Sequence, residues 1–162
     1  LWGALRLVRG YKKPSWGYFL RAESFYNVAT NIDEMDEEPG PGGRVIDSYG
    51  GVSLHRQSHG ESFLSLVEHR FGGQGLYLLD EPENSLSPTR QMELTEYIEN
   101  AARFFHCQFV ISTHSPFLLS LRGAKIYDLD SDPVDVRRWT ELENVRTYYD
   151  FFKKHEREFS DE

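Results

Sequence analysis

The chain has 162 residues and a formal net charge of −8, with 39% hydrophobic and 27% charged residues. These values are ordinary for one globular domain with its own core, and the acidic balance disfavours nonspecific binding to nucleic acid. The single cysteine excludes an internal disulfide, and every apolar run is far shorter than the roughly 18 residues of a membrane span. We therefore expect no membrane partner and a cytoplasmic location.

The first predicted elements are a strand at 18–22 and a short helix that Ser24 caps and that reaches Ile32. An acidic run and a Pro-Gly tract follow over residues 33–43. Because like charges repel and proline and glycine interrupt helices, we expect an exposed loop there. A metal-binding or partner-binding loop is the alternative interpretation, and nothing else in the sequence supports it.

Beyond residue 58, short apolar strands alternate with amphipathic helices. A buried helix face is predicted from Phe63, Leu64, Val67 and Phe71, and strands are predicted at 76–79, 109–111 and 125–129. This alternation indicates an α/β fold with a largely parallel sheet, organised as a single domain over residues 1–162.

Capping signals place the other helices. Ser87 followed by Pro88 predicts a helix start that runs on through Phe105, because a capping hydroxyl precedes a proline with helical φ. A short helix is predicted over 116–121. Thr140 and Glu143 have the spacing of a capping box, which predicts a last helix through Phe152 and a polar tail over 153–162.

Two predicted strands end in polar residues, Asp80-Glu81 and Ser112-Thr113-His114. Ligands of open α/β sheets bind at the carboxyl ends of strands, so both clusters fall where a site is expected. One carboxylate could serve Mg²⁺ while its neighbour orients an attacking water, and a histidine could contact a phosphate. Taken alone, each cluster has an ordinary alternative: a solvated turn for the carboxylates and a loop histidine for His114.

A third cluster, Ser58-His59-Gly60-Glu61, lies directly before the helix of Phe63 and Val67. Free N–H groups at a helix start attract anions, and a glycine allows the backbone to approach a ligand closely. An ordinary capped helix start is the alternative interpretation.

The order and spacing of these clusters resemble the ABC-type ATPases, especially the soluble branch with recombination-type and AAA-like predicted ATPases. Residues 78–88, Leu-Leu-Asp-Glu-Pro-Glu-Asn-Ser-Leu-Ser-Pro, look like a Walker B strand followed by a D-loop. Residues 112–119, Ser-Thr-His-Ser-Pro-Phe-Leu-Leu, look like the switch-histidine segment of this branch. The resemblance covers roughly residues 50–130 and implies a P-loop NTPase-like three-layer fold that binds and hydrolyses ATP with Mg²⁺.

By this resemblance, Asp80 would hold the water shell of Mg²⁺, Glu81 would position the hydrolytic water and His114 would contact the γ-phosphate. The signature segment departs from the transporter form, because His59 and Glu61 replace glycine and glutamine. That departure favours the soluble branch over transport.

The resemblance also implies contacts across an ATP-dependent homodimer. Ser58 and Gly60 would contact the γ-phosphate of nucleotide held by a partner subunit, and Glu61 belongs to the same nucleotide-binding segment. Residues 85–87, with Ser87, would form the D-loop at the dimer interface.

No Gly-x-x-x-x-Gly-Lys-Ser/Thr occurs in the chain, although such a loop cradles the phosphates in this family. Because the chain starts at Leu1 rather than Met, we expect a truncated N-terminal part, no hydrolysis by the chain alone and some uncovered apolar surface. Two alternatives stay open: a degenerate, non-enzymatic module that binds a protein or nucleic acid, and a split ATPase whose P-loop lies on another chain.

Overall fold

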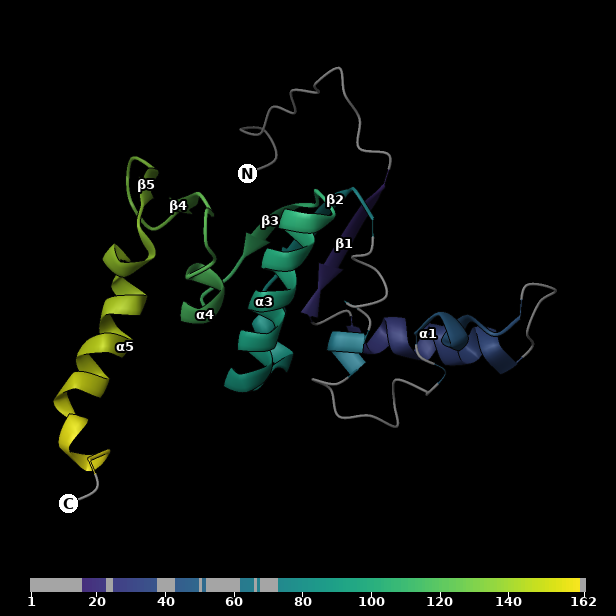
Figure 1. Ribbon diagram of the computed structural model, residues 1–162, viewed down its shortest axis with the longest axis horizontal. Coiled ribbons are helices and arrows are strands. Elements are labelled where there is room, and N and C mark those ends of the chain that lie inside the picture. The colour runs from purple at the N-terminus through teal and green to yellow at the C-terminus, as the bar shows by residue number, and fades with distance from the viewer. Residues whose placement is uncertain are drawn as a thin grey trace.

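The computed structural model describes residues 16–22, 25–37, 43–49, 51, 62–65, 67 and 73–160. They form a mixed α/β fold around a parallel sheet, which confirms the predicted fold class and is consistent with a P-loop NTPase-like fold (Figure 1). The sheet has three adjacent strands in the order β1 (Gly17–Arg21), β2 (Leu76–Asp80) and β3 (Gln108–Ser112).

Helices and a small hairpin make up the other elements. The α-helices are α1 (Phe25–Glu37), α3 (Pro88–Phe104), α4 (Pro116–Leu119) and α5 (Glu143–Lys154). Single 3₁₀ turns are η2 (Val45–Tyr49), η4 (Pro82–Ser85), η5 (Trp139–Glu141) and η6 (Glu156–Glu158). The hairpin pairs β4 (Ile126–Asp128) with β5 (Asp135–Arg137), and residues 62–65 and 67 are also helical.

One face of the sheet is buried. Tyr77 and Leu79 of β2 point into the core together with Leu94 and Ile98 of α3, which crosses in front of the strands (Figure 1). The Tyr77 ring stacks on Phe109 of β3 with a centroid distance of 5.2 Å. Burying a side chain of this size stabilises the fold by roughly 1.5–3 kcal/mol, so this face carries much of the stability. The predicted helix face of Phe63, Leu64 and Val67 is buried in the same core, whereas Phe71 lies outside the described residues.

The opposite face of the sheet is apolar and exposed. The parallel register aligns Phe19, Leu78 and Val110 in one row across the three strands. Their exposed fractions are 60%, 37% and 56%. This row is uncovered apolar surface of the kind that the sequence predicts, and a third layer over it stays a prediction.

The predicted start of the long helix is confirmed. The Ser87 hydroxyl accepts a hydrogen bond from the Arg90 N–H at 3.4 Å, and Pro88 occupies the first helical position. The helix runs to Phe104 and ends through His106, whose φ of 54° is left-handed. The chain then turns directly into β3.

The acidic segment differs from the expected loop. α1 continues through residues 33–37 rather than ending at Ile32, and residues 38–42 lie outside the described part. The Asp36 carboxylate accepts the backbone N–H groups of Val45 and Ile46, at 2.5 Å and 2.8 Å. Two charge-assisted hydrogen bonds offset the repulsion within the acidic run, which the sequence pattern alone could not reveal.

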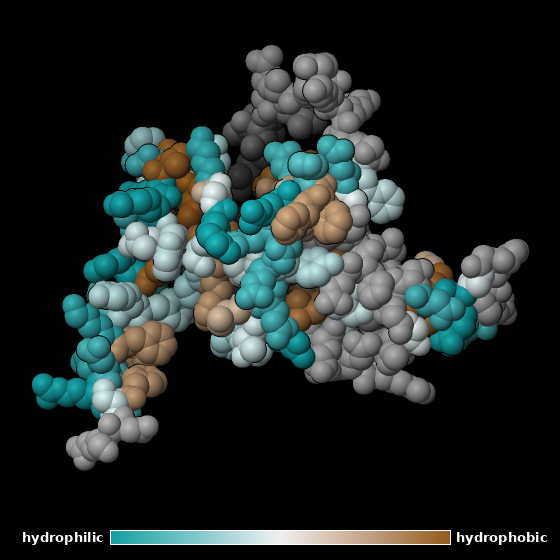
Figure 2. Space-filling view, in the orientation of Figure 1, coloured by the Kyte–Doolittle hydropathy of each residue, from teal (hydrophilic) through white to brown (hydrophobic). Residues whose placement is uncertain are grey.

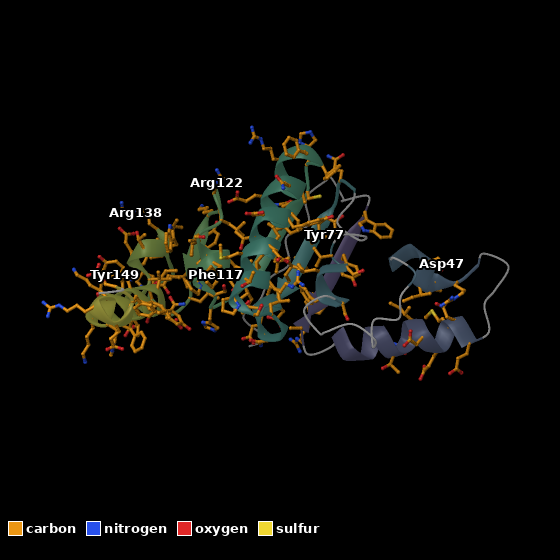
Figure 3. The ribbon with its side chains drawn as sticks, turned by 60° about the horizontal axis from the view of Figure 1, so that its bottom comes forward. Asp47, Tyr77, Phe117, Arg122, Arg138 and Tyr149 are labelled. Atoms are coloured by element: carbon orange, nitrogen blue, oxygen red, sulfur yellow. The ribbon has the colours of Figure 1, made fainter. Side chains whose placement is uncertain are left out.

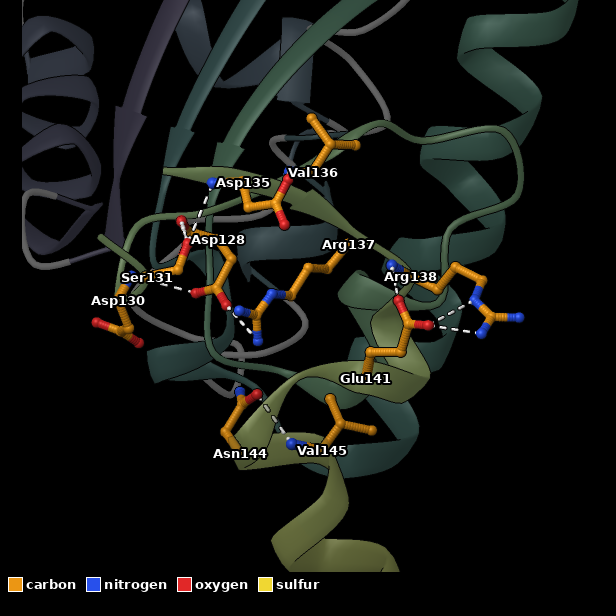
Figure 4. Close-up of polar contacts among 10 residues, drawn as sticks. All are labelled: Asp128, Asp130, Ser131, Asp135, Val136, Arg137, Arg138, Glu141, Asn144 and Val145. Atoms are coloured by element: carbon orange, nitrogen blue, oxygen red, sulfur yellow. Dashed lines mark hydrogen bonds and ion pairs between the residues drawn. The ribbon is translucent and has the colours of Figure 1, made fainter. Parts of the chain in front are cut away.

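The start of the last helix also differs. Thr140 lies within η5, and α5 begins only at Glu143, so the predicted capping box of Thr140 and Glu143 is wrong. Arg138 and Glu141 instead form reciprocal contacts around η5, as Figure 4 shows. This pair closes the η5 turn, and α5 therefore starts at Glu143 rather than directly after Thr140.

α5 extends away from the sheet, at the opposite end of the molecule from α1 (Figure 1). Figure 3 places Tyr149 on this helix, well away from Tyr77 at the centre. The helix continues through Lys154 and η6 follows, so part of the predicted polar tail is helical. Apolar side chains appear along the lower part of α5 (Figure 2). The most exposed aromatic residues of α5 are Tyr148, Tyr149, Phe151 and Phe152, and Phe159 beyond η6 is exposed as well. Among the described residues, no helix has the length and apolar character needed to cross a membrane.

Candidate functional site

The carboxyl ends of the three strands meet at one edge of the sheet. The register places Arg21, Asp80 and Ser112 opposite one another as the last residues of β1, β2 and β3. The Arg21 Nε donates to Asp80 Oδ2 at 2.8 Å. The Asp80 carboxylate, which the sequence predicts to bind metal, therefore lies at this edge and forms an ion pair with the Arg21 guanidinium.

Glu81 follows at a sharp change in backbone direction. Its φ of 46° and ψ of 52° are left-handed, a conformation that non-glycine residues rarely adopt. Its N–H still donates to the Ser112 carbonyl at 2.9 Å, so the turn stays attached to β3. The Glu81 carboxylate accepts from Asn84 Nδ2 at 2.6 Å, whereas Asp80 turns to Arg21. The two adjacent carboxylates thus have different partners.

His114 lies two residues beyond β3 and is exposed. Its backbone N–H donates to Glu83 Oε1 at 2.6 Å, and its carbonyl accepts from Asn144 Nδ2 at 3.1 Å. The main chain of the predicted switch histidine is therefore held from both sides, by the turn after β2 and by the first turn of α5.

Glu83 is a residue of this site to which the sequence assigned no role. One of its oxygens, Oε1, accepts three hydrogen bonds: from Thr113 Oγ1 at 2.7 Å, from the His114 N–H at 2.6 Å and from the Ser115 N–H at 3.1 Å. These contacts join the segment after β2 to the segment after β3. The only signal in the sequence is a second glutamate two positions beyond Glu81, and nothing in that spacing indicates its partners.

Ser115 ties the same segment to the helices. Its side chain is buried, donates to Gln91 Oε1 at 2.7 Å and accepts from the N–H groups of Phe117 and Leu118. A buried hydroxyl with all of these contacts satisfied is a rigid anchor. The start of α4 is thereby fixed against α3.

The residues predicted to act across a dimer are only partly described. Ser58, Gly60 and Glu61 lie outside the described residues. Ser87 is exposed, and its hydroxyl caps α3. The structure thus brings Asp80, Glu81 and the His114 segment together, while the contacts of the signature segment stay a prediction.

The donor chemistry fits a magnesium ion that binds together with nucleotide. Among the described residues, no three His, Cys, Asp or Glu side chains gather as a metal cage. Mg²⁺ beside nucleotide phosphates needs only one or two carboxylates, because phosphates and waters supply the other ligands. Asp80, the residue that the sequence predicts as the magnesium ligand, has an exposed side-chain fraction of 31%.

Comparisons with known proteins agree with this setting. A family model described as "AAA domain, putative AbiEii toxin, Type IV TA system" matches residues 50–120, a range that contains Asp80, Glu81 and His114. The "Retron Vc95 probable ATPase" of Vibrio cholerae serotype O1 biovar El Tor is 29% identical over 115 residues. That alignment covers 60% of this chain but only 22% of the length of the relative. Both similarities support an AAA-like ATPase relationship with nucleotide binding for this part of the chain.

Proposed function

We propose that this chain supplies the acidic edge of an ATP-hydrolysing site. The proposal is supported above all by the carboxyl edge of the parallel sheet, where Asp80 ends β2, Glu81 comes next and the His114 segment follows β3. Parallel α/β sheets bind their ligands at this edge. The similarity to AAA-like proteins and to a probable ATPase points to ATP as the ligand.

Each residue has a separate role in this proposal. Glu81 orients the attacking water and accepts its proton, while the left-handed backbone turns its carboxylate away from Asp80. Asp80 would hold Mg²⁺, which when bound offsets the negative charge of the phosphates. His114 donates a hydrogen bond to the γ-phosphate.

Hydrolysis in this proposal also needs a phosphate cradle, since phosphoryl transfer depends on positioning and charge stabilisation that a P-loop provides, and the given residues contain no P-loop motif. Either a longer chain or a second chain would supply it. The carboxylates and the histidine are the parts that this chain contributes.

A metal-free, non-enzymatic role is the competing proposal, and one observation favours it. Arg21 already neutralises Asp80 through a 2.8 Å contact. This pair is partly exposed, so it contributes at most about 1 kcal/mol and Mg²⁺ with nucleotide can replace it. We therefore favour the ATPase.

The test uses this chain together with its P-loop, on one polypeptide or two. Glu81→Gln is expected to keep ATP binding and to slow turnover on the order of 10²–10⁴-fold, the usual effect of losing a general base. Asp80→Asn is expected to weaken Mg²⁺-dependent binding of ATP instead. Steady-state phosphate release and binding of labelled ATP at varied Mg²⁺ separate the two effects. Equal behaviour of the two variants, or an unchanged rate for Glu81→Gln, would show that the roles are assigned wrongly.

A further inference from the structure

We propose that Glu83 is a positioning residue that holds His114 in its working place. The proposal rests on the function proposed for His114 above and adds the element that aims it. Glu83 lies in η4, the turn that begins directly after Glu81. The same turn therefore carries the proposed base, Glu81, and the residue that supports the histidine segment.

The contacts have the form of an anion held in a backbone cradle. Three consecutive residues, Thr113, His114 and Ser115, direct one hydroxyl and two N–H groups at a single carboxylate oxygen. Successive N–H groups that converge in this way make a concavity for an anion, and bonds to an ionised acceptor are stronger than neutral ones. Glu83 fills the concavity and so determines the path of the chain through His114.

The second end of the histidine segment is held as well. Asn144 of α5 donates to the His114 carbonyl at 3.1 Å, and Ser115 donates to Gln91 of α3 at 2.7 Å. The backbone of His114 is thus bonded at both its N–H and its carbonyl, while the residue as a whole is exposed. Such an arrangement fixes the backbone from which the imidazole projects and leaves the ring available to a ligand.

The second oxygen of Glu83 makes the role testable. Oε2 is buried and has no hydrogen-bond partner within the part of the chain that the structure describes. Glu83→Gln keeps an accepting oxygen but removes the negative charge and places an NH₂ group at the other atom, whereas Glu83→Ala removes the acceptor altogether. If acceptor geometry positions His114, glutamine rescues part of what alanine loses.

The first experiment measures amide hydrogen exchange in this chain by NMR and needs no activity. Glu83→Ala is expected to lower the protection of the His114 and Ser115 amides at least about tenfold, as expected for losing a bond to a charged acceptor. Sheet amides such as Leu79 should keep their protection, and Glu83→Gln, which keeps an acceptor without its charge, should lose less protection than Glu83→Ala. Unchanged protection in Glu83→Ala, loss throughout the sheet, or glutamine behaving like alanine would each overturn the proposal.

The second experiment measures turnover once a P-loop is supplied. Glu83→Ala and His114→Ala are each expected to lower kcat with little change in KM for ATP, and the double variant should be no slower than His114→Ala. Additive losses would mean that Glu83 acts independently of His114, against the proposal. Glu93→Ala is the matched control, because Glu93 is an exposed carboxylate paired only locally with Arg90.

The two experiments separate the two proposals. If His114→Ala leaves kcat unchanged while the exchange data follow the expected pattern, the function proposed for His114 fails and the structural link to Glu83 stands. If His114→Ala lowers kcat and Glu83→Ala does not, the proposed function stands and the positioning role is wrong.

Discussion

At the scale of single residues, Glu81 combines a required carboxylate with an unfavourable backbone. Its φ of 46° puts the backbone in the left-handed region. This conformation costs on the order of 1–2 kcal/mol for a residue other than glycine, because Cβ comes too close to a carbonyl oxygen. The N–H contact to Ser112 and the side-chain contact to Asn84 hold it there. Strain of this kind is tolerated where the surrounding structure over-determines the conformation.

This strain predicts that Glu81→Gly is more stable than Glu81→Ala by about 1 kcal/mol, although both variants lose the contact to Asn84. For a chain of this size the difference corresponds to a Tm gap of roughly 2–4 °C, measured by thermal unfolding. Both variants should lack turnover. An alanine variant as stable as the glycine variant would show that the backbone is relaxed at this position.

Cys107 is a buried packing residue between α3 and β3. Burial is the main cause that raises the pKa of its thiol, and burial also raises the pKa of the neighbouring Tyr77 hydroxyl. Both groups donate to the Gly73 carbonyl, at 3.3 Å and 2.8 Å. Since the thiolate is the reactive form, the raised pKa makes this cysteine a poor nucleophile near neutral pH.

The same shifts predict alkaline destabilisation. A folded-state pKa above the unfolded value means that the stabilising contribution is complete below the unfolded pKa and is lost as pH rises through the folded pKa. The free energy of unfolding should therefore start to fall near about pH 9, where an ordinary thiol ionises, and should fall further above about pH 10, where an ordinary tyrosine hydroxyl ionises, measured by urea denaturation. Cys107→Ala should show a shallower fall, and an identical slope in the two proteins would rule out the thiol as a contributor.

At the scale of elements, adjacent residues of β2 face different surroundings. Leu79 is 2% exposed in the core, whereas Leu78 is 37% exposed in the row with Phe19 and Val110. Strand geometry causes this alternation, because successive side chains point to opposite faces. Both residues are leucine, so hydropathy does not indicate which of them is buried. The packing of helices against one face of the sheet decides it.

This difference predicts unequal costs of truncation in the printed chain. Leu79→Ala should lower the free energy of unfolding by about 2–5 kcal/mol, the usual range for a buried leucine. Leu78→Ala should cost less, about 1–2 kcal/mol, because 37% of its surface is already exposed to water. Chemical denaturation of both variants checks this. Similar losses would mean that the face of Leu78 is covered in solution.

At the scale of the whole molecule, we predict an ATP-dependent head-to-tail homodimer of the complete protein. Ser58 and Gly60 of one subunit would face the nucleotide bound near Asp80 and Glu81 of the other. Nucleotide at such an interface favours association, because a helix start attracts phosphate and ligand binding stabilises the assembled form. Sedimentation of the Glu81→Gln protein with ATP should reveal a dimer.

A mixing experiment tests the exchange of residues between subunits. Ser58→Arg and Glu81→Gln proteins should each be inactive alone, and mixing them should restore partial turnover through heterodimers with one intact site. The turnover of Glu81→Gln protein alone, at the same total concentration as the mixture, supplies the baseline. A monomer in sedimentation together with no rescue on mixing would exclude this mode of assembly.

Local patterns were sufficient to predict much of this protein. Apolar runs and capping residues located β1 to β4, though not β5, and the start of α3 after Ser87. Polar residues at strand ends indicated the proposed site at Asp80, Glu81 and His114. These features depend on the alternation of side chains along a few neighbouring residues, which the order of amino acids encodes directly.

Contacts between distant residues required the folded chain. Arg21 and Asp80 are 59 positions apart, and Glu83 meets His114 31 positions later, so neither pairing has a local pattern. Asp36 extends α1 through partners nine and ten positions away, Val45 and Ile46. Arg138 and Glu141 are only three positions apart, so their turn is a local competitor of the predicted cap at Thr140. Side-chain contacts of this kind depend on strand order and packing, whereas the residues that carry the proposed chemistry are visible in the sequence.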